Sequence, residues 1–268
     1  MMDGQLLVIF LLTFVIHLIG TLAYSVRIAG TRTGRIAVSL SLFNILVLIS
    51  RTSNSFQAPL LAKRVEVNLQ STVATSMEAD FRWLLLAATL ATIVGGVLIP
   101  TFQRLFFHAV EVFGRQRSMS ALLLRGFSPA GILHLKESLR IPAAMNITAL
   151  RVAPSIPKRV VLLNAIAMAI WTVGVFSALY AGYLSPEYRV TASMLSAVIN
   201  GAATILMFMV IDPYLSVLTD DAAEGKISEG YFRRGVVWLT GSRLAGTVLA
   251  QLLLVPGASL IVLVAHWL

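Results

Sequence analysis

Residues 160–183 read VVLLNAIAMAIWTVGVFSALYAGY, and this stretch decides the class of the fold. It contains no charged residue. As an α-helix it is about 36 Å long at 1.5 Å per residue, which is enough to cross the roughly 30 Å hydrocarbon core of a bilayer. A backbone in lipid must satisfy its own hydrogen bonds, and no alternating ten-residue segments recur in the chain. The stretch therefore predicts a transmembrane helix rather than a strand of a β-barrel.

Similar apolar runs occur on both sides of this stretch, and each is long enough to cross a membrane as a helix. The six predicted spans are residues 5–26, 36–57, 82–103, 160–183, 190–212 and 236–266. The last is over-long and contains Pro256 followed by Gly257, so a kink is expected there. The predicted fold is an all-α polytopic membrane protein, with residues 1–268 forming one membrane domain.

The composition excludes the main alternatives to a membrane protein. The chain is 57% apolar and 12% charged, with a mean hydropathy of +0.85. A soluble domain carries about 25% charged residues, so a soluble globular enzyme and a disordered chain are both excluded. The chain has no cysteine, which excludes disulfides, thiolate catalysis and thiolate metal sites. No cofactor is predicted.

The net charge of +9 is explained by the positions of the basic residues. Fifteen of the 21 Lys and Arg residues lie in segments 27–35, 104–159 and 213–235, and four lie on the other side of the predicted membrane. The positive-inside rule places the fifteen in the cytoplasm and both termini outside. The basic loops thus predict orientation and contact with anionic membrane lipids, and no nucleic acid is expected as a partner.

Segment 104–159, between the third and fourth spans, is too long for a plain turn. It mixes Leu and Phe with Arg at helical spacing and is broken by prolines. This pattern predicts short amphipathic helices lying in the cytoplasmic interface. A solvated basic loop is the alternative.

Two arginines and one histidine fall well inside the predicted spans, away from their ends, where a charge costs roughly 2.5–3.5 kcal/mol. They are Arg51 in the second span, Arg243 in the sixth and His17 in the first. Arginine suits a phosphate because its planar guanidinium donates two parallel hydrogen bonds. We therefore predict Arg51, Arg243 and His17 as contacts for an anionic substrate. The alternatives are arginines that bond helix-end carbonyls or snorkel outward, and a histidine that is hydrogen-bonded between helices.

Three amides share the second span with Arg51. Asn44 and Asn54 lie seven and three residues from Arg51, on the same side of the helix, and Gln57 follows on that side. Asn44, Asn54 and Gln57 are predicted as further substrate contacts. Amides also hold helices together in membranes, and this role stays open for each of them.

The chain lacks the sequence signatures of the common hydrolases and nucleotide-binding proteins. It has no HExxH, no G-x-S-x-G and no phosphate-binding loop. His108 with Glu111, and His134 with Glu137, form two His-x-x-Glu pairs in the cytoplasmic segment. We interpret them as surface pairs, and no metal site is predicted.

The stretch His17–Glu66 reads HLIGTLAYSVRIAGTRTGRIAVSLSLFNILVLISRTSNSFQAPLLAKRVE. With the six spans and the total length, it resembles the Amj family of bacterial lipid II flippases, the alternate to MurJ. The resemblance implies a multi-pass protein of the bacterial cytoplasmic membrane that acts in peptidoglycan biosynthesis. It implies transport of an undecaprenyl-diphosphate-linked precursor, lipid II, from the inner to the outer leaflet. It supplies no site residues.

Two rival functions remain open beside a flippase. One is a non-transporting membrane scaffold that recruits partners through segment 104–159. The other is an intramembrane hydrolase of lipid diphosphates, which lacks a clear acid–base constellation in this sequence. The oligomeric state is not determined by the sequence, and a homo-oligomer is compatible with it.

Overall fold

The computed structural model describes residues 3–71, 76–116, 118, 124, 128–142, 148 and 156–268. Within these residues the secondary structure is helical, without a strand, which confirms the all-α prediction. The elements are α1 (Gly4–Thr33), α2 (Ile36–Gln70), α3 (Met77–Gln116), α5 (Pro129–Ser138), α7 (Lys158–Leu184), η2 (Pro186–Tyr188), α8 (Arg189–Leu206), η3 (Met207–Ile211), α9 (Asp212–Ala223) and α10 (Glu229–Trp267).

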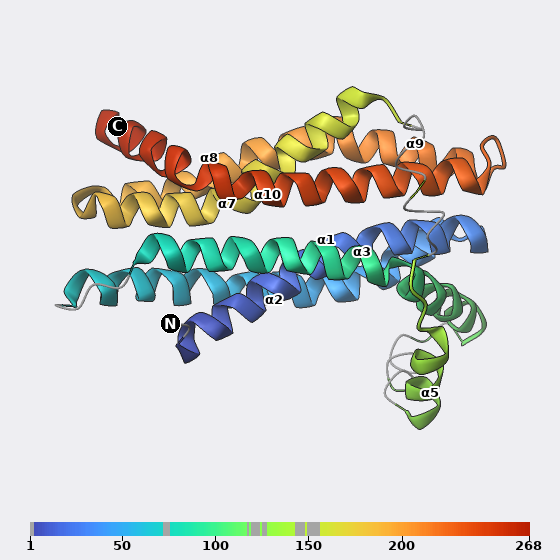
Figure 1. Cartoon of the computed structure of the whole chain (residues 1–268). Coiled ribbons are helices and arrows are strands. Elements are labelled where there is room, and N and C mark those ends of the chain that lie inside the picture. The colour runs from blue at the N-terminus through green and yellow to red at the C-terminus, as the bar shows by residue number, and fades with distance from the viewer. Residues whose placement is uncertain are drawn as a thin grey trace.

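The long helices form two groups of three (Figure 1). In the first group α1 packs against α2 and α3; in the second, α7 packs against α10 and α8. The two groups meet mainly where α3 lies against α10. Figure 1 shows the N-terminus and the C-terminus at the same end of the bundle, as an even number of crossings requires.

Among the described residues, six helical segments are long and apolar enough to cross a membrane, as predicted. The fifth consists of η2, α8, a π-helical stretch at η3 and α9, which together form one segment, Pro186–Ala223. Most segments extend beyond their predicted ends. The predictions ended each span where its apolar run ends, but polar residues at a membrane surface can continue the same helix. Pro256 lies inside α10 without ending it, and the C-terminal part of α10 bends in Figure 1.

Local sequence explains where the helices begin and end. Asp3 caps α1 by accepting a hydrogen bond from the Leu6 amide at 2.8 Å, and Ser228 caps α10 by accepting from the Tyr231 amide. Gly34 ends α1 with φ 65°, a left-handed conformation that glycine adopts without strain.

Small residues and one amide join α7 to α10. A Cβ added to Gly246 would lie 2.5 Å from the Ala165 carbonyl oxygen, so the two helices touch at this glycine. The Asn164 side-chain amide donates to the Leu239 carbonyl at 3.1 Å and to the Ser242 hydroxyl at 2.7 Å. Both features hold the second group of helices together.

The segment between α3 and α7 is described in part. Helix α3 continues past residue 103 to Gln116, since Phe106 and Val110 are buried against the first two helices. Helix α5 projects away from the bundle in Figure 1, and Leu133, Leu139 and nearby Ile141 are exposed. The rest of the predicted amphipathic segment lies largely outside the described residues. Its interfacial position stays a prediction.

Candidate functional site

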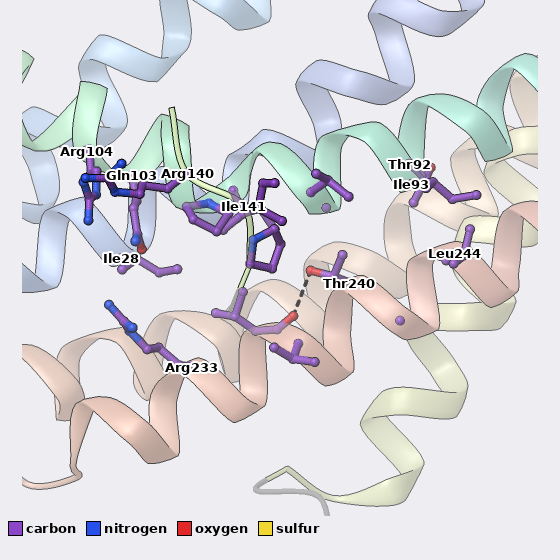
Figure 2. Close-up of a pocket in the computed structure, with 18 of the residues that line it drawn as sticks. Ile28, Thr92, Ile93, Gln103, Arg104, Arg140, Ile141, Arg233, Thr240 and Leu244 are labelled. Carbon is purple, nitrogen blue, oxygen red and sulfur yellow. Dashed lines mark hydrogen bonds between the residues drawn. The ribbon is translucent and has the colours of Figure 1, made fainter. Parts of the chain in front are cut away.

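A cavity of about 640 Å³ lies between α1, α3 and α10, where the two groups of helices meet (Figure 2). The segment that follows α5 crosses it, and this segment is bonded to α3. The Arg140 amide donates to the Thr101 hydroxyl, and that hydroxyl donates to the Arg140 carbonyl. The cavity is lined by Ile28, Arg32, Thr92, Ile93, Gly96, Val97, Ile99, Pro100, Gln103, Arg104, Arg140, Ile141, Pro142, Arg233, Val236, Val237, Thr240, Gly241 and Leu244.

Four of the lining residues are arginines, and we call them the arginine mouth: Arg32, Arg104, Arg140 and Arg233. Figure 2 shows the last three at one end of the cavity, and Arg32 shares Glu229 with Arg233. Glu229 neutralises part of their charge, because it pairs with Arg32 at 2.6 Å and with Arg233 at 2.9 Å. Arg104 and Arg140 form no ion pair with a carboxylate of the described residues. The mouth therefore carries excess positive charge, and it consists of guanidinium groups, which are well suited to bind a phosphate.

The walls beyond the arginine mouth are mainly apolar. Ile93 and Val97 of α3 are each 44% exposed, so this wall also faces the outside of the bundle. Gly96 permits close approach of α3 to α10, since a Cβ there would lie 3.2 Å from the Thr240 methyl. A cationic end followed by an apolar wall open to the surroundings matches an amphiphile with an anionic headgroup.

At the other end of the bundle, polar contacts hold the same helices together. The Arg82 guanidinium of α3 donates to the Gln251 carbonyl of α10 at 3.1 Å, and the Gln251 side chain donates to the Arg82 carbonyl at 3.0 Å. These reciprocal hydrogen bonds hold α3 against α10 beyond the end of the cavity that is opposite the arginine mouth.

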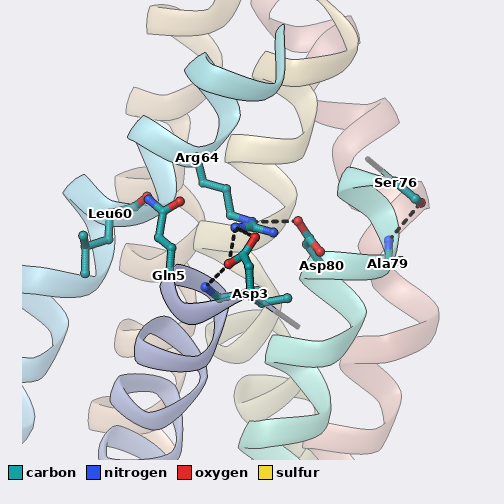
Figure 3. Close-up of polar contacts among 8 residues, drawn as sticks. Asp3, Gln5, Leu60, Arg64, Ser76, Ala79 and Asp80 are labelled. Carbon is teal, nitrogen blue, oxygen red and sulfur yellow. Dashed lines mark hydrogen bonds and ion pairs between the residues drawn. The ribbon is translucent and has the colours of Figure 1, made fainter. Parts of the chain in front are cut away.

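Arg64 forms a second polar network at that end (Figure 3). Its guanidinium donates to Asp80 of α3 at 2.7 Å and to Asp3, before α1, at 2.8 Å. The pKa of Asp3 lies below its usual value of 3.8, mainly because its carboxylate accepts a hydrogen bond from the Leu6 amide and secondly because it accepts one from Arg64. The network joins the ends of α1, α2 and α3.

Two of the predicted site residues, Arg243 and His17, are buried together at the junction of the two groups of helices. Arg243 is 9% exposed and donates from Nη1 to the Met168 sulfur at 3.4 Å, while its Nε has no partner among the described residues. The Arg243 guanidinium lies against Gly20 of α1, where any larger residue would occupy its space. His17 is 4% exposed and lies edge-on to Trp171, with ring centroids 5.3 Å apart.

The prediction that Arg243 and His17 contact an anion fits this environment without being tested by it. A buried guanidinium with no carboxylate partner among the described residues is costly, and an anion would compensate its charge. The Nδ1 atom of His17 also lacks a described hydrogen-bond partner. Neither residue lines the cavity, although Leu244, next to Arg243, does.

The four predicted residues of α2 divide between two faces. Gln57 is buried, and its side chain donates to the Thr13 hydroxyl of α1 at 2.5 Å, a contact that holds the two helices together. Arg51, Asn44 and Asn54 are exposed on the outside of the bundle. The structure therefore does not bring these three together with Arg243 or with the cavity.

Sequence reasoning missed the arginine mouth because it interpreted those arginines as orientation signals and as general contacts for anionic membrane lipids, and not as the lining of one cavity. A signal was present in the spacing: Arg233, Val237, Thr240 and Leu244 recur on one face of α10. On α3, Ile93, Val97, Pro100 and Arg104 recur in the same way. An apolar helix face that ends in an arginine marks each wall of the cavity.

Comparisons with known proteins agree with the resemblance seen in His17–Glu66. The model of the family described as "Amj: Alternate to MurJ" matches residues 12–265. A protein named Lipid II flippase Amj from Bacillus subtilis (strain 168) is 41% identical over 264 residues, which cover 98% of this chain and 97% of that protein. No solved structure matches the chain. The chain belongs to the Amj family, the alternate to MurJ.

Proposed function

We propose that this protein is a lipid II flippase of the bacterial cytoplasmic membrane. The observation that carries the proposal is membership of the Amj family over nearly the whole chain, with a relative named as a lipid II flippase. The six membrane-spanning segments and the amphiphilic cavity at the junction of the helix groups support it. The proposed activity transfers lipid II from the inner to the outer leaflet, and no covalent bond changes.

The arginine mouth is the proposed first contact of the diphosphate. The positive-inside rule places this end of the bundle at the cytoplasmic surface, where the lipid starts, and leaves both termini outside. Arg104 and Arg140 then replace water around the diphosphate oxygens. The prenyl chain remains in the bilayer along the exposed Ile93 and Val97 wall of α3.

The buried Arg243 is proposed as a deeper contact for the same charge. It lies ten residues along α10 from Arg233, about 15 Å further into the membrane. Its guanidinium lies between Gly20 of α1 and Met168 of α7 rather than in the cavity, so this contact requires α1 and α10 to move apart. His17 and Trp171 border the space that such a movement opens.

Reconstitution into liposomes with labelled lipid II tests the proposal against both rivals. Transfer of label between leaflets supports a flippase, an unchanged distribution supports a scaffold, and release of phosphate supports a hydrolase. Arg104→Gln should lower the transfer rate about tenfold or more, because a lost charged hydrogen bond costs about 1.5–3 kcal/mol. Arg115→Gln, an exposed arginine on the same helix outside the cavity, is the matched control.

A further inference from the structure

One face of α2 carries a polar stripe on the outside of the bundle. The residues of this outer stripe are exposed and recur at the spacing of one helix face, interrupted only by Leu48: Ser41, Asn44, Arg51, Thr52 and Ser55. The opposite face of the helix, with Leu42, Ser53, Gln57 and Leu61, is buried against the other helices. The stripe therefore points away from the protein core.

Arg51 lies near the middle of the membrane. Along α2 it is about 24 Å from Arg35 and about 18 Å from Lys63, the basic residues that flank this span on its two sides. Arg51 and Asn44 form no side-chain hydrogen bond or ion pair within the part of the chain that the structure describes. The hydroxyls of Thr52 and Ser55 bond carbonyls of their own helix, so they do not compensate the charge. An exposed guanidinium at this depth is costly, and an anionic partner would compensate its charge.

Two common partners do not fit this position. A resident phospholipid keeps its phosphate at the membrane surface, roughly half of the 30 Å hydrocarbon thickness away from Arg51. If two copies of the chain met through α2 about a two-fold axis along the membrane normal, Arg51 of one copy would lie beside Arg51 of the other. Like charges at the same depth repel strongly in a medium of low dielectric constant. An anionic headgroup in transit is the occupant that matches both the depth and the charge.

We infer that the outer stripe of α2 binds the diphosphate headgroup of the transported lipid as that headgroup crosses the middle of the membrane. This inference rests on the proposed function and adds a second surface to it. The cavity lies at one end of the bundle, and α2 contributes no residue to its lining. The stripe instead continues from Ser41 to Ser55 across the span, and its outward position leaves the prenyl chain in lipid throughout.

Photo-crosslinking in proteoliposomes tests the contact with Arg51 left intact. A photoreactive amino acid replaces Ser55, one turn from Arg51, and labelled lipid II is the probe. A matched control position is Val198 of α8, which is 66% exposed, faces outward and has no polar stripe around it. We expect crosslinks to lipid II from position 55, competed by unlabelled lipid II and not by phosphatidylglycerol, and none above background from position 198.

Transport rates of Arg51 variants test the same inference by a second route. Arg51→Ala should lower the rate of lipid II transfer about tenfold or more, while Arg51→Lys retains part of it, since an ammonium lacks the bidentate fork. Asn44→Leu should also slow transfer, with the protein still eluting as a single folded species.

Three results would overturn the inference. They are wild-type transfer by Arg51→Ala, the absence of lipid crosslinks from position 55 in an active preparation, and crosslinks from position 55 to a second copy of the chain. If the wild-type protein itself transfers no lipid II, the proposed function fails. The first two failures, observed in a wild-type background that transfers lipid II, concern the stripe alone.

Discussion

Replacing Arg243 by methionine should make the protein more stable and less active. Arg243 is 9% exposed and contacts Met168 through sulfur, with no ion pair to a described carboxylate. Methionine replaces the stem of the arginine side chain without a charge, although it is two atoms shorter and does not reach the place of the guanidinium beside Gly20. An arginine near the centre of a membrane helix costs about 2.5–3.5 kcal/mol, and replacing buried charges by apolar side chains gains up to roughly 4 kcal/mol.

We therefore expect Arg243→Met to raise the free energy of unfolding by about 2–3 kcal/mol. At about 2–4 °C per kcal/mol for a chain of this size, the midpoint of thermal unfolding in lipid nanodiscs should rise by about 4–12 °C. The rate of lipid II transfer should fall about tenfold, because the proposed deeper contact for the diphosphate is lost. Stability and activity thus change in opposite directions.

Arg115→Met is the control, since Arg115 is exposed and its replacement should change stability by less than about 0.5 kcal/mol. A lower unfolding midpoint for Arg243→Met would refute the reasoning. It would mean that the guanidinium satisfies neighbouring groups of the folded protein and that its burial is favourable. Normal lipid transfer by a stabilised variant would remove Arg243 from the transport path.

Three further predictions concern packing, charge and topology. Gly246→Ala should destabilise the protein by about 1–3 kcal/mol in nanodisc melts, because its Cβ would meet a backbone oxygen of α7 at 2.5 Å, whereas Gly241→Ala, with open space around it, should not. The pKa of Asp3 is lowered in the folded protein, so its carboxylate stabilises the fold above pH 3.8 and loses this effect as the pH falls through the folded-state pKa. The stability difference between the wild type and Asp3→Asn should therefore shrink in acid. A difference that stays constant with pH would contradict this. A cysteine at Gln70 should react with an impermeant thiol reagent in intact cells and one at Ser118 should not, and the reverse pattern would invert the topology.

The helical spans could be predicted because length and hydropathy act along the chain. The run at 160–183 corresponds to Lys158–Leu184, and a continuous apolar run in lipid has one low-energy form. The extension of α3 to Gln116 was not predictable from hydropathy, because Phe106 and Val110 are buried there by contact with other helices. The pairing of α3 with α10 is likewise a property of the assembled bundle.

The depth of a residue follows from the sequence, but its direction around the helix axis does not. Arg51 and Arg243 both fall inside predicted spans, and the sequence presents them as similar intramembrane cations. In the structure Arg243 is buried between the helix groups, whereas Arg51 is exposed on the outer stripe. The difference depends on which face of α2 packs against α1. That face is marked by Gln57 bonding Thr13, a contact that needs both helices to be placed.

The arginine mouth shows that an arginine at the end of a membrane helix can set the orientation of the protein or bind a ligand, and that charge alone does not distinguish the two roles. Basic residues accumulate at the cytoplasmic ends of membrane helices because they set orientation, and this holds whether or not they bind a ligand. Arg104 and Arg115 lie on the same helix with the same charge, but only Arg104 lines the cavity. Its distinguishing feature is the apolar face that precedes it through Ile93 and Val97. A lipid whose headgroup is anionic and whose tail is apolar needs this order of residues along one face, so the amphiphilic face, rather than the positive charge alone, is what relates this end of the bundle to lipid transport.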